Sequence, residues 1–241
     1  MDTNIKQAMV DYFARQISTQ LDTVSLKIFR IVLSHIKENK HPNVVKVSRK
    51  EILNFLSEKE STNYTQIKDI IIHTLLPLTI GLTNDKGKEY YLHIFSGIIY
   101  PDSTQNETIT FVFLPCAFPY ILESKQNFSQ YDIKNIKSFH SKYSILIYEY
   151  LVFQMANNFF KYGTYNIGVA KLRVITGTKD IYEVFKDFEK RVIVPAVNEI
   201  NEGKCEFLIK YNKIKENNKV VTISFELSVN PNSFKCCKTT R

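Results

Sequence analysis

The chain has 241 residues, of which 44% are hydrophobic, and its 32 Lys and Arg side chains outnumber its 24 Asp and Glu by eight. This apolar content is enough to build a packed core and excludes wholesale disorder, and the length fits one large domain or two of about 100–150 residues. No apolar run reaches the roughly 18 residues that a membrane span requires, and no basic segment precedes an apolar stretch at the N-terminus. We therefore expect a soluble, cytoplasmic protein with no membrane partner.

The positive charge belongs to the second half of the chain. Residues 1–133 contain 14 basic and 14 acidic side chains, whereas residues 134–241 contain 18 basic and 10 acidic ones. This asymmetry favours a polyanionic partner for the second half, although charge alone is equally compatible with a solubilising surface.

The first predicted domain covers residues 1–123 and opens with helices. Apolar residues recur at helical spacing near the N-terminus and again over residues 26–36. Residues 44–47 predict a short strand. Ser48 then opens a capping box, S-R-K-E, for a helix that ends at Leu56.

A second helix of this domain is predicted to start at Ser61–Thr62 and to stop before Pro77, which has no amide hydrogen to donate. Two strand-like runs, residues 90–100 and 108–113, follow and are joined by a polar loop. Helix, strand, two helices and a two-stranded ribbon is the order of a winged helix. The polar stretch after this domain, residues 124–140, predicts a linker.

The second predicted domain, residues 141–228, repeats the same order. Ser141 caps a helix that continues to about Asn157. An extended segment and a short helix over residues 169–176 follow, and Gly177 is expected to end this helix in a left-handed conformation.

A long helix over residues 181–200, which Pro195 is expected to kink, and a hairpin of residues 205–211 and 220–227 complete the second domain. The hairpin turn is rich in asparagine, which tolerates positive φ. Residues 229–241 are predicted to be a flexible tail. The fold class is therefore α+β, with two tandem winged-helix (helix-turn-helix) domains.

The helix over residues 181–200 carries the strongest candidates for DNA contact, because the second helix of a helix-turn-helix enters the major groove. Its apolar positions, from Ile181 onward, repeat at helical spacing and predict a core-facing side. The opposite side carries Lys186, Lys190 and Arg191. A bidentate Arg–guanine contact discriminates bases by roughly 1–3 kcal/mol. The alternative is a solvated face with an Asp187–Arg191 pair worth only about 0.3–0.5 kcal/mol.

Basic residues also surround the hairpin tip, where the wing of a winged helix contacts phosphate without reading sequence. They are Lys213, Lys215 and Lys219, and Lys179 before the long helix is grouped with them. Charged hairpin tips are common in proteins, so these residues gain weight only beside the neighbouring helix.

In the first domain, the second helix offers a weaker set of candidates, Asn63, Gln66 and Lys68. Asn and Gln side chains can read adenine, but they are equally at home on any solvated helix. Because this half has no net charge, it is better suited to self-association or to binding a partner protein.

The sequence lacks the motifs of common catalytic sites. It has no GxxxxGK[ST] phosphate loop, no GxSxG, and no HxH or HExxH pair, and its cysteines form no CxxC. We therefore expect no enzymatic activity, no metal site and no cofactor.

Three motifs of the second half resemble the Rep_3 family of plasmid replication initiators, which are tandem winged-helix proteins that bind iterons. The first is SKYSILIYEYL at residues 141–151, which is similar to the family's SxYSxxLYExL helix. The second is LRVITG at residues 172–177, and the third is FEKRVIVPAVNEIN at residues 188–201, which is similar to FkxxVxxPAxxEIN. The first half is similar in layout and hydrophobic pattern only.

The resemblance implies a DNA-binding function without catalysis. Such proteins bind direct repeats at a plasmid origin through the second winged helix, help to open adjacent A·T-rich DNA, and recruit the host initiator ATPase and replicative helicase. Several form homodimers, in equilibrium with monomers, through the first domain and repress their own promoter. The resemblance also implies that Lys186, Lys190 and Arg191 contact bases, and it places the protein in a bacterial cytoplasm. A winged-helix repressor without a replication role, and a protein-interaction module, are the alternatives.

Overall fold

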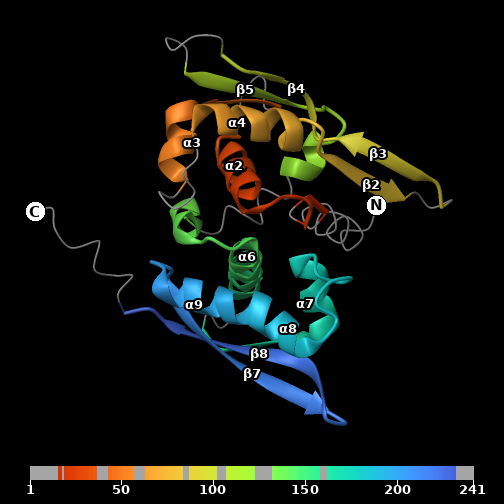
Figure 1. Ribbon diagram of the computed structural model, residues 1–241, viewed down its shortest axis with the longest axis vertical. Coiled ribbons are helices and arrows are strands. Elements are labelled where there is room, and N and C mark those ends of the chain that lie inside the picture. The colour runs from red at the N-terminus through yellow and green to blue at the C-terminus, as the bar shows by residue number, and fades with distance from the viewer. Residues whose placement is uncertain are drawn as a thin grey trace, which may run out of the picture. The chain divides into compact units, whose positions relative to one another are not determined.

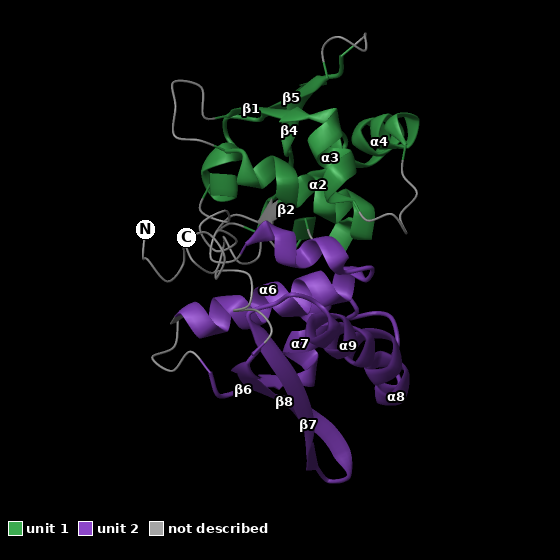
Figure 2. Ribbon diagram, turned by 90° about the vertical axis from the view of Figure 1, so that its left-hand side faces the viewer, with its two compact units in different colours: residues 1–129 green, residues 130–241 purple. Residues whose placement is uncertain are grey.

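The computed structural model describes residues 16–17, 19–36, 43–56, 63–83, 87–101, 107–122, 132–157 and 162–231. The chain divides into two compact units, Met1–Ser129 and Gln130–Arg241 (Figure 2). Each unit packs its helices against a three-stranded antiparallel sheet (Figure 1), so the α+β fold with two winged helices is confirmed. Within the described ranges, no helix has the length and apolar character needed to cross a bilayer.

The first unit begins, in its described part, with helix α2, Thr23–Ser34, for which the Asp22 carboxylate accepts a hydrogen bond from the Ser25 amide at 2.7 Å. Strand β1, Val44–Ser48, and helix α3, Arg49–Phe55, follow as predicted. The predicted capping box at Ser48 is wrong. Ser48 occupies the N-cap position without a side-chain capping bond, and the Glu51 carboxylate that a capping box would use lies 3.0 Å from His35 Nε2 instead.

The next helix consists of α4, Tyr64–Ile70, and a π segment, η2, Ile71–Leu75. Its N-cap is Asn63, so it begins later than the predicted start at Ser61–Thr62, which lies outside the described residues. The buried residues Ile67, Ile71 and Leu75 face the core. The helix ends before Pro77, as predicted.

The predicted strand over residues 90–100 is in fact two strands of different sheets. Strand β3, Glu89–His93, pairs with β2, Thr79–Thr83, which was not predicted, whereas β4, Phe95–Ile99, pairs with β5, Thr108–Phe113. The chain changes partner at buried Ile94, whose amide donates to the Leu78 carbonyl while its carbonyl accepts from Leu114. Alternation of residue types marks strands but not the partner with which each pairs.

The division between the units, after Ser129, lies within the predicted linker. The first part of this stretch, residues 124–131, lies outside the described residues. Its second part is not a bare linker, because η3, a 3₁₀ helix over Ile133–Ser138 that is capped by Asp132, packs Ile136 into the core, and buried Phe139 follows it.

The second unit repeats the first with longer elements. Helix α6, Lys142–Asn157, begins after Ser141, whose hydroxyl accepts a hydrogen bond from the Tyr143 amide at 3.2 Å, so the predicted cap is confirmed. Strand β6, Thr164–Gly168, and helix α7, Val169–Thr176, follow. Gly177 ends α7 with φ of 66°, the left-handed conformation that was predicted.

The long helix of this unit runs from Phe185 to Glu202. It consists of α8, Phe185–Phe188, a π segment, η4, Glu189–Ile193, and α9, Val194–Glu202. The predicted start at Ile181 is wrong, because residues 181–184 form a turn and Ile181 is 44% exposed instead of buried. A kink was predicted at Pro195. Just before this residue, the α-helix is interrupted by the π segment, in which the Val194 amide bonds to the Glu189 carbonyl five residues back.

The hairpin of β7, Phe207–Glu216, and β8, Lys219–Val229, extends beyond the helices as a two-stranded ribbon (Figure 1). Asn217 and Asn218 form its turn with φ of 47° and 64°, which confirms the prediction of positive φ there. The sheet order β6-β8-β7 matches the order β1-β5-β4 of the first unit. Residues 232–241, which contain most of the predicted tail, lie outside the described residues.

Candidate nucleic-acid interface

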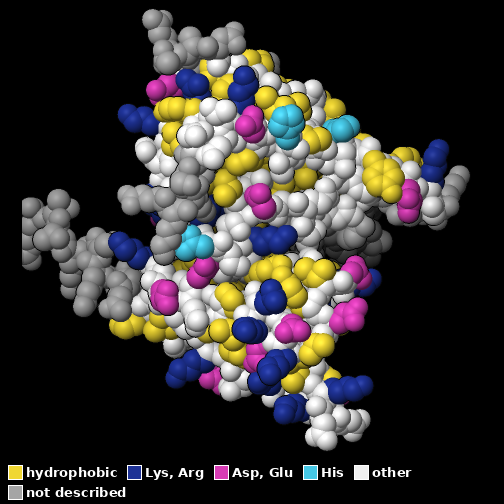
Figure 3. All heavy atoms as spheres, viewed as in Figure 1, with side chains coloured by type: hydrophobic (Ala, Val, Ile, Leu, Met, Phe, Trp, Pro, Cys, Tyr) yellow, Lys and Arg dark blue, Asp and Glu magenta, His cyan; other side chains and the backbone are white. Residues whose placement is uncertain are grey.

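The α8–η4 helix, Phe185–Ile193, separates its apolar and basic side chains. Phe188 and Val192 are completely buried, whereas all three predicted cations of this helix are exposed. These cations are Lys186, Lys190 and Arg191. Figure 3 shows several Lys and Arg side chains on the surface of the second unit, interspersed with Asp and Glu.

Arg191 does not take part in the ion pair that was the alternative interpretation. Among the residues that the structure describes, no ion pair joins Arg191 to Asp187. Instead, its guanidinium carbon lies 5.5 Å from the centre of the Tyr182 ring. The guanidinium therefore has its hydrogen-bond donors available to an outside acceptor while a ring supports one side.

The turn that precedes α8 is built around Arg173 of α7. Its guanidinium donates hydrogen bonds to four carbonyls and lies 4.4 Å from the centre of the Phe188 ring. The four acceptors are Thr178 at 3.3 Å, Ile181 at 3.0 Å, Tyr182 at 2.7 Å and Glu183 at 3.1 Å. Arg173 thus joins the end of α7, the turn and the following helix. Sequence reasoning noted it as a motif residue but missed this role, because nothing in the sequence marks its acceptors, which lie 5 to 10 residues further along the chain.

Glu189 connects the α8–η4 helix to the hairpin. Its carboxylate accepts a hydrogen bond from the Tyr211 hydroxyl at 2.7 Å and pairs with the Lys213 ammonium at 2.9 Å. Partial burial raises the pKa of Glu189, but the hydrogen bonds from Lys213 and Tyr211 outweigh it and hold the pKa below its ordinary value. Burial and the bond to Glu189 raise the pKa of Tyr211 to about 12, so its hydroxyl stays protonated and donates at neutral pH.

The hairpin lysines consequently fall into two groups. Lys213 lies within strand β7 and is engaged by Glu189, so it is not at the tip where it was expected. Lys215 and Lys219 flank the Asn217–Asn218 turn and are exposed. Lys179 is also exposed, in the turn after α7.

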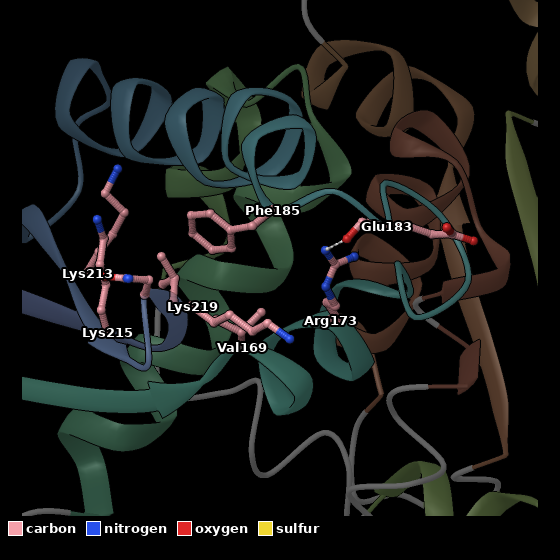
Figure 4. Close-up of a pocket in the computed structure, with 9 residues that line it drawn as sticks. Val169, Arg173, Glu183, Phe185, Lys213, Lys215 and Lys219 are labelled. Carbon is pink, nitrogen blue, oxygen red and sulfur yellow. Dashed lines mark hydrogen bonds between the residues drawn. The ribbon is translucent and has the colours of Figure 1, made fainter.

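A groove of about 550 Å³ separates the start of α8 from the hairpin (Figure 4). Lys213, Lys215 and Lys219 line it from the hairpin, and Arg173 lies across from them. Phe185 and Glu183 complete the helix side. Because cations outnumber the one carboxylate in this lining, the groove is suited to an anionic backbone such as a phosphodiester chain.

The first unit uses its candidate residues differently. The Asn63 side chain accepts a hydrogen bond from the Gln66 amide at 3.0 Å, and the Gln66 side chain accepts one from the Asn63 amide at 2.8 Å. Both side-chain oxygens are therefore engaged in a reciprocal capping box, where adenine reading needs an oxygen and an NH₂ group together. Lys68 is exposed, with its ammonium 5.7 Å from the centre of the Tyr100 ring.

A second arginine–aromatic group lies beside Lys68. The Arg49 guanidinium is 5.0 Å from the Tyr64 ring centre and 5.8 Å from that of Tyr100, whose hydroxyl donates to the Tyr64 carbonyl at 3.2 Å. Partial burial raises the pKa of Tyr100, and Arg49 partly offsets this effect. The described part of the chain contains no cluster of three His, Cys, Asp or Glu that could hold a metal ion.

Comparison with known proteins agrees with this layout. A family model described as the WH1 domain of an initiator replication protein matches residues 11–152, and one described as the WH2 domain of an initiator Rep protein matches residues 168–227. A replication initiation protein of Escherichia coli is 26% identical over 96 residues. That match covers 40% of this chain and 30% of the relative, so it spans less than a third of the relative's length.

Two solved structures share the fold. The Pi initiator protein, determined in complex with iteron DNA, superposes with a TM-score of 0.70 at 22% identity, covering 90% of this chain and 94% of Pi. Domains 2 and 3 of RctB superpose with a TM-score of 0.53 at 14% identity, covering 86% of this chain and 82% of that one. At these identities the likeness concerns the fold, which is two winged helices in tandem.

Proposed function

This chain belongs to the Rep_3 family of initiator replication proteins, and from that membership we propose that it is a plasmid replication initiator that binds direct repeats, or iterons, at an origin. The observation that carries the proposal is the exposed set Lys186, Lys190 and Arg191 on one short stretch of helix, in the half of the chain that holds the whole net charge. The Pi initiator, which shares this fold, was determined with iteron DNA bound. An exposed basic helix that follows a rigid turn is the element that enters the major groove in helix-turn-helix proteins.

The two basic groups have different tasks in this proposal. Lys186, Lys190 and Arg191 contact base edges, which supplies sequence preference. Lys179, Lys215 and Lys219 contact phosphates on either side, which supplies affinity without preference and fixes the register of the helix in the groove. Lys213, held by Glu189, positions the hairpin relative to the helix.

Initiation of replication also requires an opened DNA segment and host replication proteins. We propose that binding at the repeats helps to open an adjacent A·T-rich segment and recruits the host initiator ATPase and replicative helicase in the bacterial cytoplasm. The same surface, bound at an inverted repeat, represses the protein's own promoter. No catalytic step is assigned to the chain.

The first unit is proposed to mediate a homodimer that is in equilibrium with the monomer. Its two-stranded sheet has an exposed outer strand, β3, in which Tyr90 is 42% and Tyr91 70% exposed. Exposed strand edges with aromatic side chains are ready templates for pairing with another chain. The lack of net charge in this half also lowers the electrostatic cost of bringing two copies together.

Plasmid retention separates an initiator from a repressor with the same domains. A plasmid without another origin, carrying the gene and its adjacent direct repeats, is expected to persist in the host. Loss of this plasmid, together with repression of a reporter from the same upstream DNA, would favour the repressor.

Salt dependence tests DNA binding itself. If about 6–8 phosphates are neutralised, log K is expected to fall against log salt with a slope of about −5 to −7. A flat response would leave only the protein-interaction module, which needs no nucleic acid.

A further inference from the structure

Tyr182, in the turn before α8, has a backbone conformation that tyrosine rarely adopts. Its φ is 54°, in the left-handed region, and it is one of three non-glycine residues with positive φ in the described part of the chain. The other two are the asparagines of the hairpin turn, a residue type that tolerates this conformation. A bulky residue held there is strained and persists only when its surroundings impose it.

The surroundings of Tyr182 fix both its backbone and its ring. Arg173 donates a hydrogen bond to the Tyr182 carbonyl at 2.7 Å, the shortest of its four bonds to the turn. The Tyr182 side chain is also a neighbour of the Tyr143 side chain, at the start of α6. Burial and this neighbour raise the pKa of Tyr143 to about 12, so the Tyr143 hydroxyl stays protonated at neutral pH.

The fixed ring is in contact with only one of the three exposed cations of the helix. The Arg191 guanidinium carbon lies 5.5 Å from the Tyr182 ring centre, which is within the range of a cation–π contact. A guanidinium held against a ring loses less conformational freedom on binding than a freely rotating one, and its edge still presents donors. The ring therefore selects a direction for Arg191 before DNA arrives.

We propose that Tyr182 is a positioning residue that holds the Arg191 guanidinium in the orientation in which it reads a base. This inference rests on the proposed DNA-binding function and names the residue that makes one of its contacts specific. The contacts run from Arg173, which fixes the turn through the Tyr182 carbonyl, to Tyr182 and from its ring to Arg191. Lys186 and Lys190 are exposed on the same helix and make no contact with this ring among the described interactions.

The test uses the full-length protein and two duplexes. One is selected by the wild-type protein from a random pool, and the other is a scrambled duplex of the same length and composition. Tyr182→Gly removes the ring and is compatible with positive φ, so it is expected to fold. It is expected to weaken binding of the selected duplex about two- to fivefold, the size of an exposed cation–π contact, and to leave binding of the scrambled duplex unchanged.

Two further readouts separate positioning from a merely structural role. When each base pair of the selected duplex is substituted in turn, Tyr182→Gly and Arg191→Ala are expected to lose preference at the same position. The double variant is expected to bind no more weakly than Arg191→Ala alone, since the ring then has nothing to position. Tyr182→Phe keeps the ring and is expected to retain most of the preference.

The outcomes distinguish this inference from the function on which it rests. If the wild-type protein shows no preference for the selected duplex, the proposed function is overturned. If it shows preference but the losses of Tyr182→Gly and Arg191→Ala add in full, or fall on different base pairs, the positioning role alone is overturned. An equal loss on both duplexes, with a lowered unfolding midpoint, would make Tyr182 a structural residue only.

Discussion

The two winged helices of this protein share a plan, and a difference that bears on function lies at the start of the second helix. Their sheets have matching strand orders, β1-β5-β4 and β6-β8-β7, and in both units a five-residue π segment lies just before a proline. In the first unit that helix starts with the reciprocal cap of Asn63 and Gln66. In the second it starts at Val184 without a side-chain cap, after a turn held by Arg173.

This difference shows how one fold supports two roles. The capping box uses the polar side chains at the start of α4 to stabilise the helix, so fewer of their groups remain for a ligand. Where an arginine from the preceding helix holds the turn instead, no side chain at the start of the second helix is used in a cap. Helix α3 has no basic residue in its last turn that could play this part. The comparison predicts that DNA binding depends on Arg173 and its neighbours and little on the first unit's capped helix.

Removal of Arg173 is expected to have the largest effect. Arg173→Met keeps an unbranched apolar side chain but loses four hydrogen bonds and the stacking on Phe188. Because bonds to a charged group are worth about 1.5–3 kcal/mol each and are not additive, we expect about 3–4 kcal/mol less unfolding free energy in the second unit. Urea unfolding of the full chain measures this loss.

The matched control is Lys171→Met, since Lys171 is exposed on the same helix. It is expected to change unfolding free energy by less than about 0.5 kcal/mol. If Arg173→Met unfolds at the same urea concentration as the control, the turn does not depend on this arginine and the contrast between the two units fails.

A pair of substitutions compares the two helices directly. Arg191→Ala is expected to weaken binding of a selected duplex by about 1–3 kcal/mol and to relax preference at one base pair. Lys68→Ala, at the corresponding helix of the first unit, is expected to cost less than about 0.5 kcal/mol and to change no preference. Titration of both variants with duplexes that carry single-base-pair substitutions measures these losses. Equal losses of binding would mean that the first unit contributes equally to base recognition.

The apolar spacing of the sequence was sufficient to predict the winged-helix order in both halves, because the core residues of both helices and strands repeat at fixed periods. Phe188 and Val192 were assigned to the core in this way and are buried. Gly177 and the asparagine turn were also predictable, since few other residues accept positive φ. These rules are local and do not require knowing which distant residues each position contacts.

What the sequence did not reveal depends on contacts between distant residues. Periodicity extended the long helix back to Ile181, because nothing local indicates that Arg173 holds residues 181–183 in a turn. The spacing of charges placed Lys213 with the other hairpin lysines, whereas its partner Glu189 is 24 residues away. Tyr182 carried no signal at all, since its positive φ is imposed by its neighbours and contrary to its own preference.

The exposed edge of the first unit offers the next test. Tyr91→Glu on strand β3 is expected to raise the dimer dissociation constant about tenfold, because a charge on a pairing edge opposes strand addition. Sedimentation velocity over a range of concentrations measures this. The control Ile99→Glu places a charge at a residue that is 66% exposed on β4, in the other sheet. If only Ile99→Glu dissociates the dimer, the pairing edge is β4.

A smaller effect is expected at the hairpin tip. Lys215→Ala is expected to weaken selected and scrambled duplexes alike, by a few-fold, and to reduce the salt slope by about one, because a phosphate contact carries no sequence information. Binding isotherms at four salt concentrations provide both numbers. A loss confined to the selected duplex would move Lys215 from the phosphate-contacting group to the reading group.

The smallest expected effect concerns the ion pair of Glu189 with Lys213, which joins the α8–η4 helix to the hairpin. The sign of its pH dependence follows from the pKa of Glu189. Because the folded-state pKa of Glu189 lies below its ordinary value of 4.5, the carboxylate contributes stability at pH values above that, and the contribution is lost as pH falls through the lower, folded pKa. Its partner Lys213 is 41% exposed, so the pair is worth less than about 1 kcal/mol. Glu189→Gln is therefore expected to be slightly less stable than wild type at pH 7, and the difference is expected to shrink as pH falls through the folded-state pKa of Glu189. The control Glu202→Gln, at an exposed position at the end of α9, is expected to change the free energy of unfolding at pH 7 by less than about 0.5 kcal/mol. A Glu189→Gln difference that grows as pH falls would mean that this carboxylate opposes the packing of the helix on the hairpin.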